Sequence, residues 1–225
     1  MQQLKQSTEN YLKIIFKLQQ IEKGGVKPLH LARTLDVSPP AVTDMLKKLS
    51  EERFVDYTPY HGVKLTKKGM IHGQNMVRRH RLWEMYLHKM LGFPWDKVHE
   101  EAERLEHASS DDVINKIEEV LGFPEYDPHG DPIPSKEGVF PKAISSVPLS
   151  KCKVGEALKV IRVSDFDNDF LHYIDTLGIQ LQKFVVIKEI RSFDHSLLIS
   201  IDGRVESISA LTASHIFVVK KGQKT

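Results

Sequence analysis

The sequence predicts a mainly α-helical protein with small β parts, in three successive segments. Helical periodicity dominates residues 1–121, interrupted by two short β-like runs near residues 54–66. A stretch rich in proline and small residues covers residues 125–148 and marks a linker. Short β-like runs then fill the rest of the chain, which indicates a small β-barrel.

The first segment has the layout of a winged helix-turn-helix. Helical patterns cover residues 8–23, 27–37 and 38–54, and two β runs joined through His61-Gly62 predict a hairpin. Ser38 is a good N-cap for the third helix and Pro39 a suitable first helical residue. On the second and third of these helices, the apolar positions expected to face inward are Leu29, Leu31, Ala32, Leu35, Val42, Leu46 and Leu49.

Three more helices follow, and then a β-rich end. The helical patterns run over residues 67–91, 95–106 and 111–121, and a Gly-Phe-Pro sequence ends the first and third. The strand-like runs after the linker are ALKVIRV, KFVVIKEI, SLLISID and HIFVVKK, with a short helix expected in DNDFLHYIDTLGI. The predicted domains are residues 1–74, residues 75–140, a linker at 141–150, and residues 151–225.

Composition excludes several classes of protein. The 225 residues contain no apolar run near the roughly 20 residues that a membrane helix requires, and the start has no secretory pattern. One cysteine, Cys152, excludes an intramolecular disulfide framework and a thiolate-rich zinc site, and it fits a reducing cytosol. We therefore expect a cytoplasmic protein without a membrane segment.

Charge is distributed unevenly along the chain. Residues 1–75 hold 12 Lys or Arg against 7 Asp or Glu, whereas residues 76–125 hold 7 against 11. A basic segment followed by an acidic one indicates a polyanionic partner for the first and cations for the second.

The third helix carries the features of a DNA-recognition helix. Such a helix needs small or polar residues at its N-terminus for base edges, with hydroxyls and cations nearby for phosphates. The candidate contacts to double-stranded DNA are Ser38, Pro39, Pro40, Thr43, Asp44, Lys47 and Lys48, with Tyr60 and Lys64 in the hairpin. A protein-binding winged helix, or lysines that only solvate a surface, is the alternative.

The middle segment contains a candidate metal site in the sequence HEEAERLEH. At 100° per residue, four ligand-type residues share one arc of about 100° on a helix: His99, Glu103, Glu106 and His107. On the preceding helix, His80 and Glu84 stack at i, i+4. Two such helices can converge on two adjacent metal sites, and imidazole with carboxylate suits Mn²⁺, Fe²⁺ or Zn²⁺. Taken singly, each residue could be a surface group or a helix pair.

These motifs resemble the diphtheria-toxin-repressor family of iron- and manganese-dependent transcriptional repressors. The resemblance covers nearly the whole chain and is carried, in order, by TENYL, SPPAVTDMLKKL, RRHRLWE, KVHEEAERLEH and PHGDPIP. It implies a dimeric repressor with a winged helix, a helical dimerisation domain and an SH3-like C-terminal domain. It also implies a palindromic operator, which a homodimer binds when a divalent cation fixes the first helix against the middle domain.

The resemblance implies two metal sites per subunit. The primary site maps to Asn10, Glu103, Glu106 and His107, and the ancillary site to His80, Glu84 and His99. Longer members add a ligand from the C-terminal domain, which maps to Asp169 or else to Asp165 or Asp167. Without the metal, the carboxylates and the first helix are expected to be loose or mutually repulsive.

Three departures from the family pattern bear on the metal. Iron-type members have Cys where this chain has Glu103, so Mn²⁺ is the preferred ion and Fe²⁺ the alternative. Manganese-type members carry Asp where this chain has the neutral Asn10, which removes one negative charge. Asp127 and Asp131 would repel the anion that iron-type members bind near the position of Arg81.

Two rival functions stay open on the sequence. A di-metal hydrolase also uses adjacent carboxylate and histidine sites, to activate water, but no further acid, base or nucleophile is evident. A winged-helix regulator could instead carry a His and Glu cluster that is merely structural. A peptide-binding C-terminal barrel is a third possibility, for which the sequence offers no clear aromatic groove.

Overall fold

The computed structural model describes residues 4–22, 24–58, 61–142, 144–165 and 167–220. The chain forms two compact units, which are described one at a time. The first unit comprises Met1–Trp83, Ala102–Phe123 and Ile133–Phe140. The second comprises Glu84–Glu101, Pro124–Pro132 and Pro141–Thr225. Helices α4 (Lys67–Leu91) and α5 (Val98–Ala108) contribute residues to both units.

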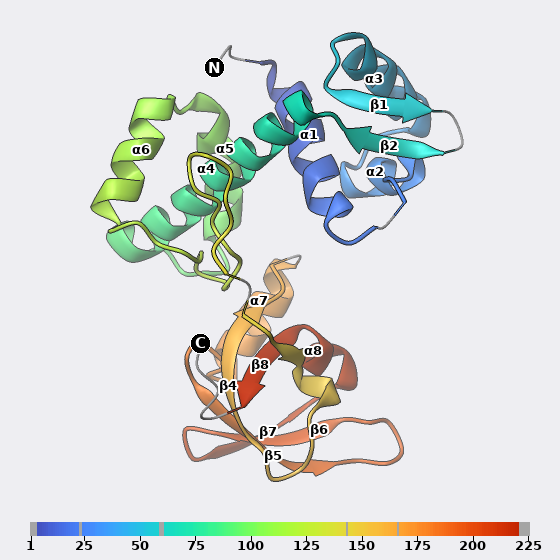
Figure 1. Ribbon diagram of the computed structural model, residues 1–225. Helices are drawn as coiled ribbons and strands as arrows, with labels where there is room; N and C mark the ends of the chain where they lie inside the picture. Colours follow the sequence, from blue (N-terminus) through green and yellow to red (C-terminus); the bar gives the residue numbers. More distant parts are fainter. Residues whose placement is uncertain (1–3, 23, 59–60, 143, 166, 221–225) are drawn as a thin grey trace. The chain divides into compact units, whose positions relative to one another are not determined.

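The winged helix-turn-helix predicted for the first segment is confirmed (Figure 1). Its elements are α1 (Gln6–Gln19), α2 (Pro28–Thr34), α3 (Pro39–Glu51), β1 (Val55–Thr58) and β2 (Gly62–Leu65). The two strands pair antiparallel, from Val55 opposite Leu65 to Thr58 opposite Gly62. Because α1 supplies Leu12, Ile15 and Phe16 to the same core as α3, movements of the two helices are mechanically linked.

The prediction that Leu29 faces this core is wrong. Leu31 and Ala32 of α2 are buried, but Leu29 is 54% exposed. On a helix at 100° per residue, Leu29 lies about 160° from Leu31 and so points to the opposite side. The stripe predicted for α3, Val42, Leu46 and Leu49, is fully buried.

The helices of the middle segment match the prediction closely. Helix α4 has the predicted bounds, and α6 covers Asp111–Val120, with the Ser110 hydroxyl accepting a hydrogen bond from the Val113 amide. Helix α5 begins at Val98 rather than at residue 95, because residues 95–97 form a turn in which the Lys97 amide bonds the Pro94 carbonyl. None of the helices in the described residues is both long and apolar enough to cross a membrane.

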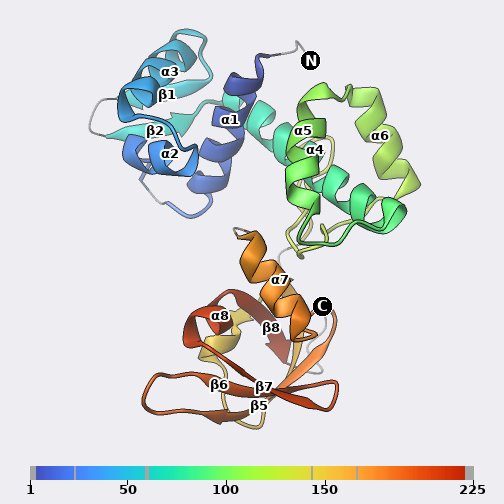
Figure 2. The ribbon, with the colours of Figure 1, turned by 180° about the vertical axis from the view of Figure 1, so that it is seen from behind.

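The second unit contains a six-stranded antiparallel sheet, seen from two sides in Figures 1 and 2. The strand order is β3-β8-β4-β5-β6-β7. The strands are β3 (Val147–Pro148), β4 (Ala157–Val163), β5 (Phe184–Ile190), β6 (Leu197–Ile201), β7 (Arg204–Ile208) and β8 (Ile216–Lys220). The short helical elements are η1 (Leu149–Lys151), α7 (Asn168–Thr176) and α8 (Ala210–Ser214).

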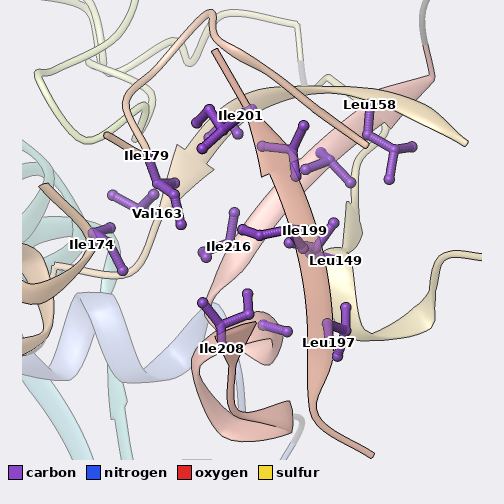
Figure 3. Packing of buried hydrophobic residues seen from close by; sticks show 14 of the residues in the cluster. Leu149, Leu158, Val163, Ile174, Ile179, Leu197, Ile199, Ile201, Ile208 and Ile216 are labelled. Carbon is purple, nitrogen blue, oxygen red and sulfur yellow. The ribbon is translucent and has the colours of Figure 1, made fainter. Parts of the chain in front are cut away.

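The sheet folds around an apolar core. Figure 3 shows its aliphatic side chains converging from several strands and from α7. The small β domain predicted for this part of the chain is therefore confirmed. Strand β7 was not predicted, although Asp202-Gly203 between β6 and β7 is a typical hairpin turn with φ of +47° and +83°.

We predict that Gly69→Ala destabilises the first unit. A Cβ at residue 69 of α4 would lie 2.0 Å from the Phe54 carbonyl oxygen and 3.0 Å from Leu65 Cδ2. Relieving this overlap should cost about 1–3 kcal/mol in free energy of unfolding, measured by urea denaturation. Gly24→Ala is the matched control, because nothing lies within 4 Å of its added Cβ. Equal losses in the two variants would contradict the prediction.

Candidate metal centre

Helix α5 brings three of the predicted primary ligands together in the first unit. Glu103, Glu106 and His107 each offer one ligand atom, and these atoms all lie within 4.8 Å of one another. Their i, i+3 and i, i+4 spacing puts them on one helix face. The set provides two carboxylates and an imidazole, which is a donor set suited to a first-row divalent cation.

Glu106 is the most enclosed member of this set. Its side chain is 0% exposed, its Oε1 lies 2.7 Å from Lys13 Nζ, and its Oε2 lies 2.6 Å from His80 Nδ1. A carboxylate removed from water requires such partners, because an isolated buried charge is strongly disfavoured. Residues from α1 and α4 therefore hold Glu106 in place on α5.

His107 has the environment of a metal-binding histidine. Its Nδ1 lies 2.6 Å from Glu9 Oε2, so the ring donates that N–H to the carboxylate. Its Nε2 is buried without a hydrogen-bond partner among the described residues and lies 3.2 Å from Glu106 Oε1. A carboxylate on one ring nitrogen and a free lone pair on the other is the arrangement that orients a histidine toward a metal.

Asn10 supplies a second unsatisfied atom on α1. Its Oδ1 is buried, and none of the described residues donates a hydrogen bond to it. Buried polar atoms usually have partners, so such an atom indicates a position where a further group can bind. Both unsatisfied atoms belong to residues predicted as primary ligands, and the residues present therefore fit a divalent cation.

Two residues of this centre, Glu9 and Lys13, were missed by sequence reasoning. Glu9 lies one turn before Lys13 on α1, and both are buried. Lys13 donates hydrogen bonds to Glu103 and Glu106. The signal was present in the sequence, because Lys13 falls within the apolar periodicity of α1, where a charged residue must find a buried partner.

A second candidate cluster lies in the second unit. Glu84, Asp127 and His129 are all buried, and each offers a ligand atom within 4.8 Å of the others. Asp127 Oδ1 accepts hydrogen bonds from the backbone amides of His129 and Asp131, both at 2.9 Å. Sequence reasoning treated Asp127 only as a group that repels anions, and it did not select His129.

His129 is held in a fixed orientation. Its Nε2 lies 2.9 Å from the Trp95 carbonyl oxygen, and its Nδ1 is buried without a hydrogen-bond partner in the described part of the chain. Burial lowers the pKa of His129, but the charges of Glu84, Asp127 and Asp165, together with the hydrogen bond to the Trp95 carbonyl, outweigh that effect and raise it. This environment favours positive charge at the ring, either as a proton bound to the imidazole or as a metal ion next to it.

Backbone packing at Gly130 fixes the position of this second cluster. Gly130 has φ of +90°, and a Cβ there would lie 2.2 Å from the Ile161 carbonyl oxygen. The neighbouring His129 carbonyl accepts a hydrogen bond from the Val163 amide at 2.9 Å. Glycine at this position therefore lets the segment that carries Asp127 and His129 pack directly on β4.

The residues predicted for the ancillary site each have contacts within their own unit. In the second unit His99 Nδ1 lies 3.2 Å from Glu84 Oε1, and in the first unit His80 contacts Glu106. Asp169 is exposed at the start of α7 and belongs to none of the candidate metal groups among the described residues. Asp165 is the aspartate of this region whose charge acts on His129. The predicted trio of His80, Glu84 and His99 stays a prediction.

Helix α3 presents a face suited to a DNA groove. Val42, Leu46 and Leu49 face the core, so Pro40, Asp44 and Lys47 lie on the outer face and are exposed. The Ser38 hydroxyl caps the helix by accepting from the Ala41 amide, and the Thr43 hydroxyl bonds the Pro39 carbonyl at 3.1 Å.

The remaining predicted DNA contacts differ in their exposure to solvent, and one lies outside the described residues. Pro39 and Lys64 are exposed and Lys48 is half-buried, whereas Tyr60 lies outside the described residues. Lys47 and Lys48 are paired with nearby acids on α3 or at its end, at 3.7 Å and 3.9 Å. These pairs are exposed and therefore weak, so the ammonium groups can turn toward phosphates.

Comparison with known proteins matches three parts of the chain to family models. Residues 3–63 match the iron-dependent repressor N-terminal DNA-binding domain, and residues 66–135 match the iron-dependent repressor metal-binding and dimerisation domain. Residues 147–220 match the FeoA domain.

Among curated proteins, the iron-dependent repressor IdeR of Mycobacterium tuberculosis is 37% identical over 136 residues, which is 60% of this chain and 58% of that protein. The match thus spans little more than half the length of that relative. The transcriptional regulator MntR of Oceanobacillus iheyensis is 34% identical over 117 residues, 52% of this chain and 78% of that protein.

Solved structures resemble the chain over most of its length. A manganese-dependent transcriptional repressor in complex with manganese is 37% identical, with a TM-score of 0.85 over 95% of this chain and 100% of that chain. The manganese regulator SloR is 32% identical, with a TM-score of 0.73 over 95% of this chain and 98% of that chain.

We predict that Glu9→Gln weakens metal binding without touching a predicted ligand. The amide cannot match the carboxylate that orients His107 through Nδ1, and loss of such a partner typically lowers metal affinity 10- to 100-fold. The measurement is titration calorimetry with Mn²⁺ after chelation, with an expected loss of about tenfold. Glu22→Gln is the control, because it alters another Glu–His contact, with His30, elsewhere on the winged domain. Unchanged affinity in Glu9→Gln would refute the assigned role.

Proposed function

This chain belongs to the iron-dependent repressor family, the metal-dependent transcriptional repressors of the diphtheria-toxin-repressor and MntR type, and from that premise we propose that it represses transcription when a divalent cation occupies the primary cluster. The observations that carry the proposal are the unsatisfied buried Nε2 of His107, grouped with Glu103 and Glu106, and the unsatisfied buried Oδ1 of Asn10 on α1. The family consists of repressors, so the hydrolase alternative is set aside.

The proposed switch works through α1. Asn10 lies on α1, whereas Glu103, Glu106 and His107 lie on α5. A bound cation supplies positive charge and coordination bonds that both helices share. Because α1 packs in one core with α3, fixing α1 restricts where the recognition helix can lie. The cation then acts by binding the DNA-competent arrangement more tightly than the others.

We propose Mn²⁺ as the preferred ion and Fe²⁺ as the alternative. Glu103 provides an oxygen where iron-type members provide a sulfur, and hard oxygen ligands suit Mn²⁺. Asn10 contributes a neutral oxygen, so the site holds one negative charge fewer than a site with Asp at that position.

A second site per subunit is proposed around Glu84, Asp127 and His129. Their burial, the 4.8 Å grouping and the unsatisfied Nδ1 of His129 support it. His99, which contacts Glu84, and Asp165, whose charge acts on His129, are the candidates to complete it. This replaces Asp169 with Asp165 as the favoured residue from the C-terminal segment.

For DNA binding we propose a homodimer in the cytoplasm that binds a palindromic operator. Residues 1–74 would bind DNA, residues 75–140 would bind metal and dimerise, and residues 151–225 would form the C-terminal domain after a linker at 141–150. In α3, Pro39 and Pro40 can contact base methyl groups, and Asp44 can accept a hydrogen bond from a base amine. Lys47, Lys48 and Lys64 supply charges for phosphates.

The test of this function is DNA selection with and without metal. Double-stranded DNA selected from a random pool should bind the full chain about 10- to 100-fold more tightly with Mn²⁺ than in chelator, measured by fluorescence anisotropy. Glu106→Gln and His107→Ala should lose that metal response. Glu119→Gln, which removes a charge from an exposed side chain of α6, should retain it. Equal binding in chelator and Mn²⁺ would leave the His and Glu cluster with a merely structural role.

We predict that Glu103→Cys shifts metal preference toward iron. A thiolate is a softer ligand than a carboxylate and favours Fe²⁺ over Mn²⁺ relative to oxygen. The concentrations of Mn²⁺, Fe²⁺, Co²⁺ and Zn²⁺ that half-activate DNA binding are to be compared in wild type and variant, without oxygen for Fe²⁺. An unchanged ratio of Fe²⁺ to Mn²⁺ would show that residue 103 does not select the metal.

A further inference from the structure

A lysine is built into the primary acidic cluster. Lys13 of α1 is only 3% exposed, and its Nζ donates hydrogen bonds to Glu103 Oε1 and, at 2.7 Å, to Glu106 Oε1. A buried ammonium carries a large desolvation penalty unless carboxylates surround it. The sequence of α1 therefore places an ammonium group among the oxygens that the proposed metal requires.

Both oxygens of Glu106 are already in contact with nitrogen atoms. Oε1 lies 2.7 Å from Lys13 Nζ and 3.2 Å from His107 Nε2, and Oε2 lies 2.6 Å from His80 Nδ1. Because the carboxylate is fully buried, it cannot gain a ligand position by turning into solvent. A cation that takes a Glu106 oxygen therefore either displaces Lys13 or His80, or binds a carboxylate whose charge is already partly compensated by them.

Lys13 is the group better suited to move. Its ammonium ends a flexible four-carbon stem, whereas the His80 imidazole has only two rotatable bonds and is fixed on α4. Lys13 also bonds Glu103, so one movement of its ammonium releases an oxygen on each of two predicted ligands. A divalent cation and an ammonium on the same oxygens repel each other, which makes their binding antagonistic.

We propose that Lys13 is a tethered cation that competes with the divalent metal for Glu103 and Glu106 and thereby sets the metal concentration at which this repressor responds. The proposal rests on the proposed function, because it assumes that the metal binds this cluster. Under this proposal, α1 carries both a predicted metal ligand, Asn10, and a competitor of the metal, Lys13, one turn apart. The two carboxylates are then neutralised at low metal concentration, so the first helix need not be repelled from α5 before the metal binds.

The test is Mn²⁺ binding to the full chain after chelation, measured by calorimetry and by the electron paramagnetic resonance signal of free Mn²⁺. Lys13→Gln should bind Mn²⁺ at least about tenfold more tightly than wild type, because no ammonium has to be displaced. The same variant should melt at a lower temperature than wild type in chelator and recover with Mn²⁺. Lys5→Gln is the control, since it removes the same charge from the exposed N-cap position of α1.

A second variant covers the case in which Lys13→Gln fails to fold. Lys13→Arg keeps the charge and holds carboxylates with a planar fork, so it should bind Mn²⁺ more weakly than wild type. Opposite shifts in the two variants, or weaker binding in Lys13→Arg alone, would support competition. Affinity in Lys13→Gln equal to that of Lys5→Gln, or weaker, would overturn it while leaving the proposed function intact. Absence of Mn²⁺ binding in wild type would overturn both.

Discussion

The structure of the candidate centre depends on one buried carboxylate. Glu106 has no exposure to solvent, and its charge is compensated by Lys13 and by hydrogen bonding with His80. These partners come from α1 and α4, so three helices of the first unit are joined at a single side chain of α5. A buried carboxylate tolerates few rearrangements, because each lost partner leaves charge uncompensated. Any ligand of this centre therefore acts on an existing network of contacts.

This network makes α1 the natural link between metal and DNA. One face of the helix supplies Leu12, Ile15 and Phe16 to the core of the winged domain, and another supplies Glu9 and Lys13 to the centre. A close-packed core transmits displacement because it has no room to absorb it. The expectation that the first helix is loose or repelled without metal therefore requires revision. Lys13 and the Glu9–His107 pair provide attractive contacts between α1 and α5.

The second cluster illustrates how context changes the meaning of a residue. In the sequence, Asp127 was an acid that would repel an anion. In the fold it lies beside Glu84 and His129 and raises the pKa of that histidine. Its orientation comes from two backbone amides that bond Oδ1, and the segment is held against β4 at Gly130. A concentration of negative charge that disfavours an anion is the same feature that favours a cation.

Local sequence patterns were sufficient to predict the winged helix, the helical segment, the small β domain and the His and Glu pattern of α5. These features depend on local periodicity, capping and turn residues, which a linear pattern records directly. The contacts of Glu9 and Lys13 with α5, and the grouping of Asp127 and His129 with Glu84, became evident only in the fold. Glu9 and His107, for example, are 98 residues apart in the sequence. Such partners are set by packing between distant elements. One sequence cannot show which buried charges compensate one another, because compensation depends on distances of a few ångströms that arise after the chain folds.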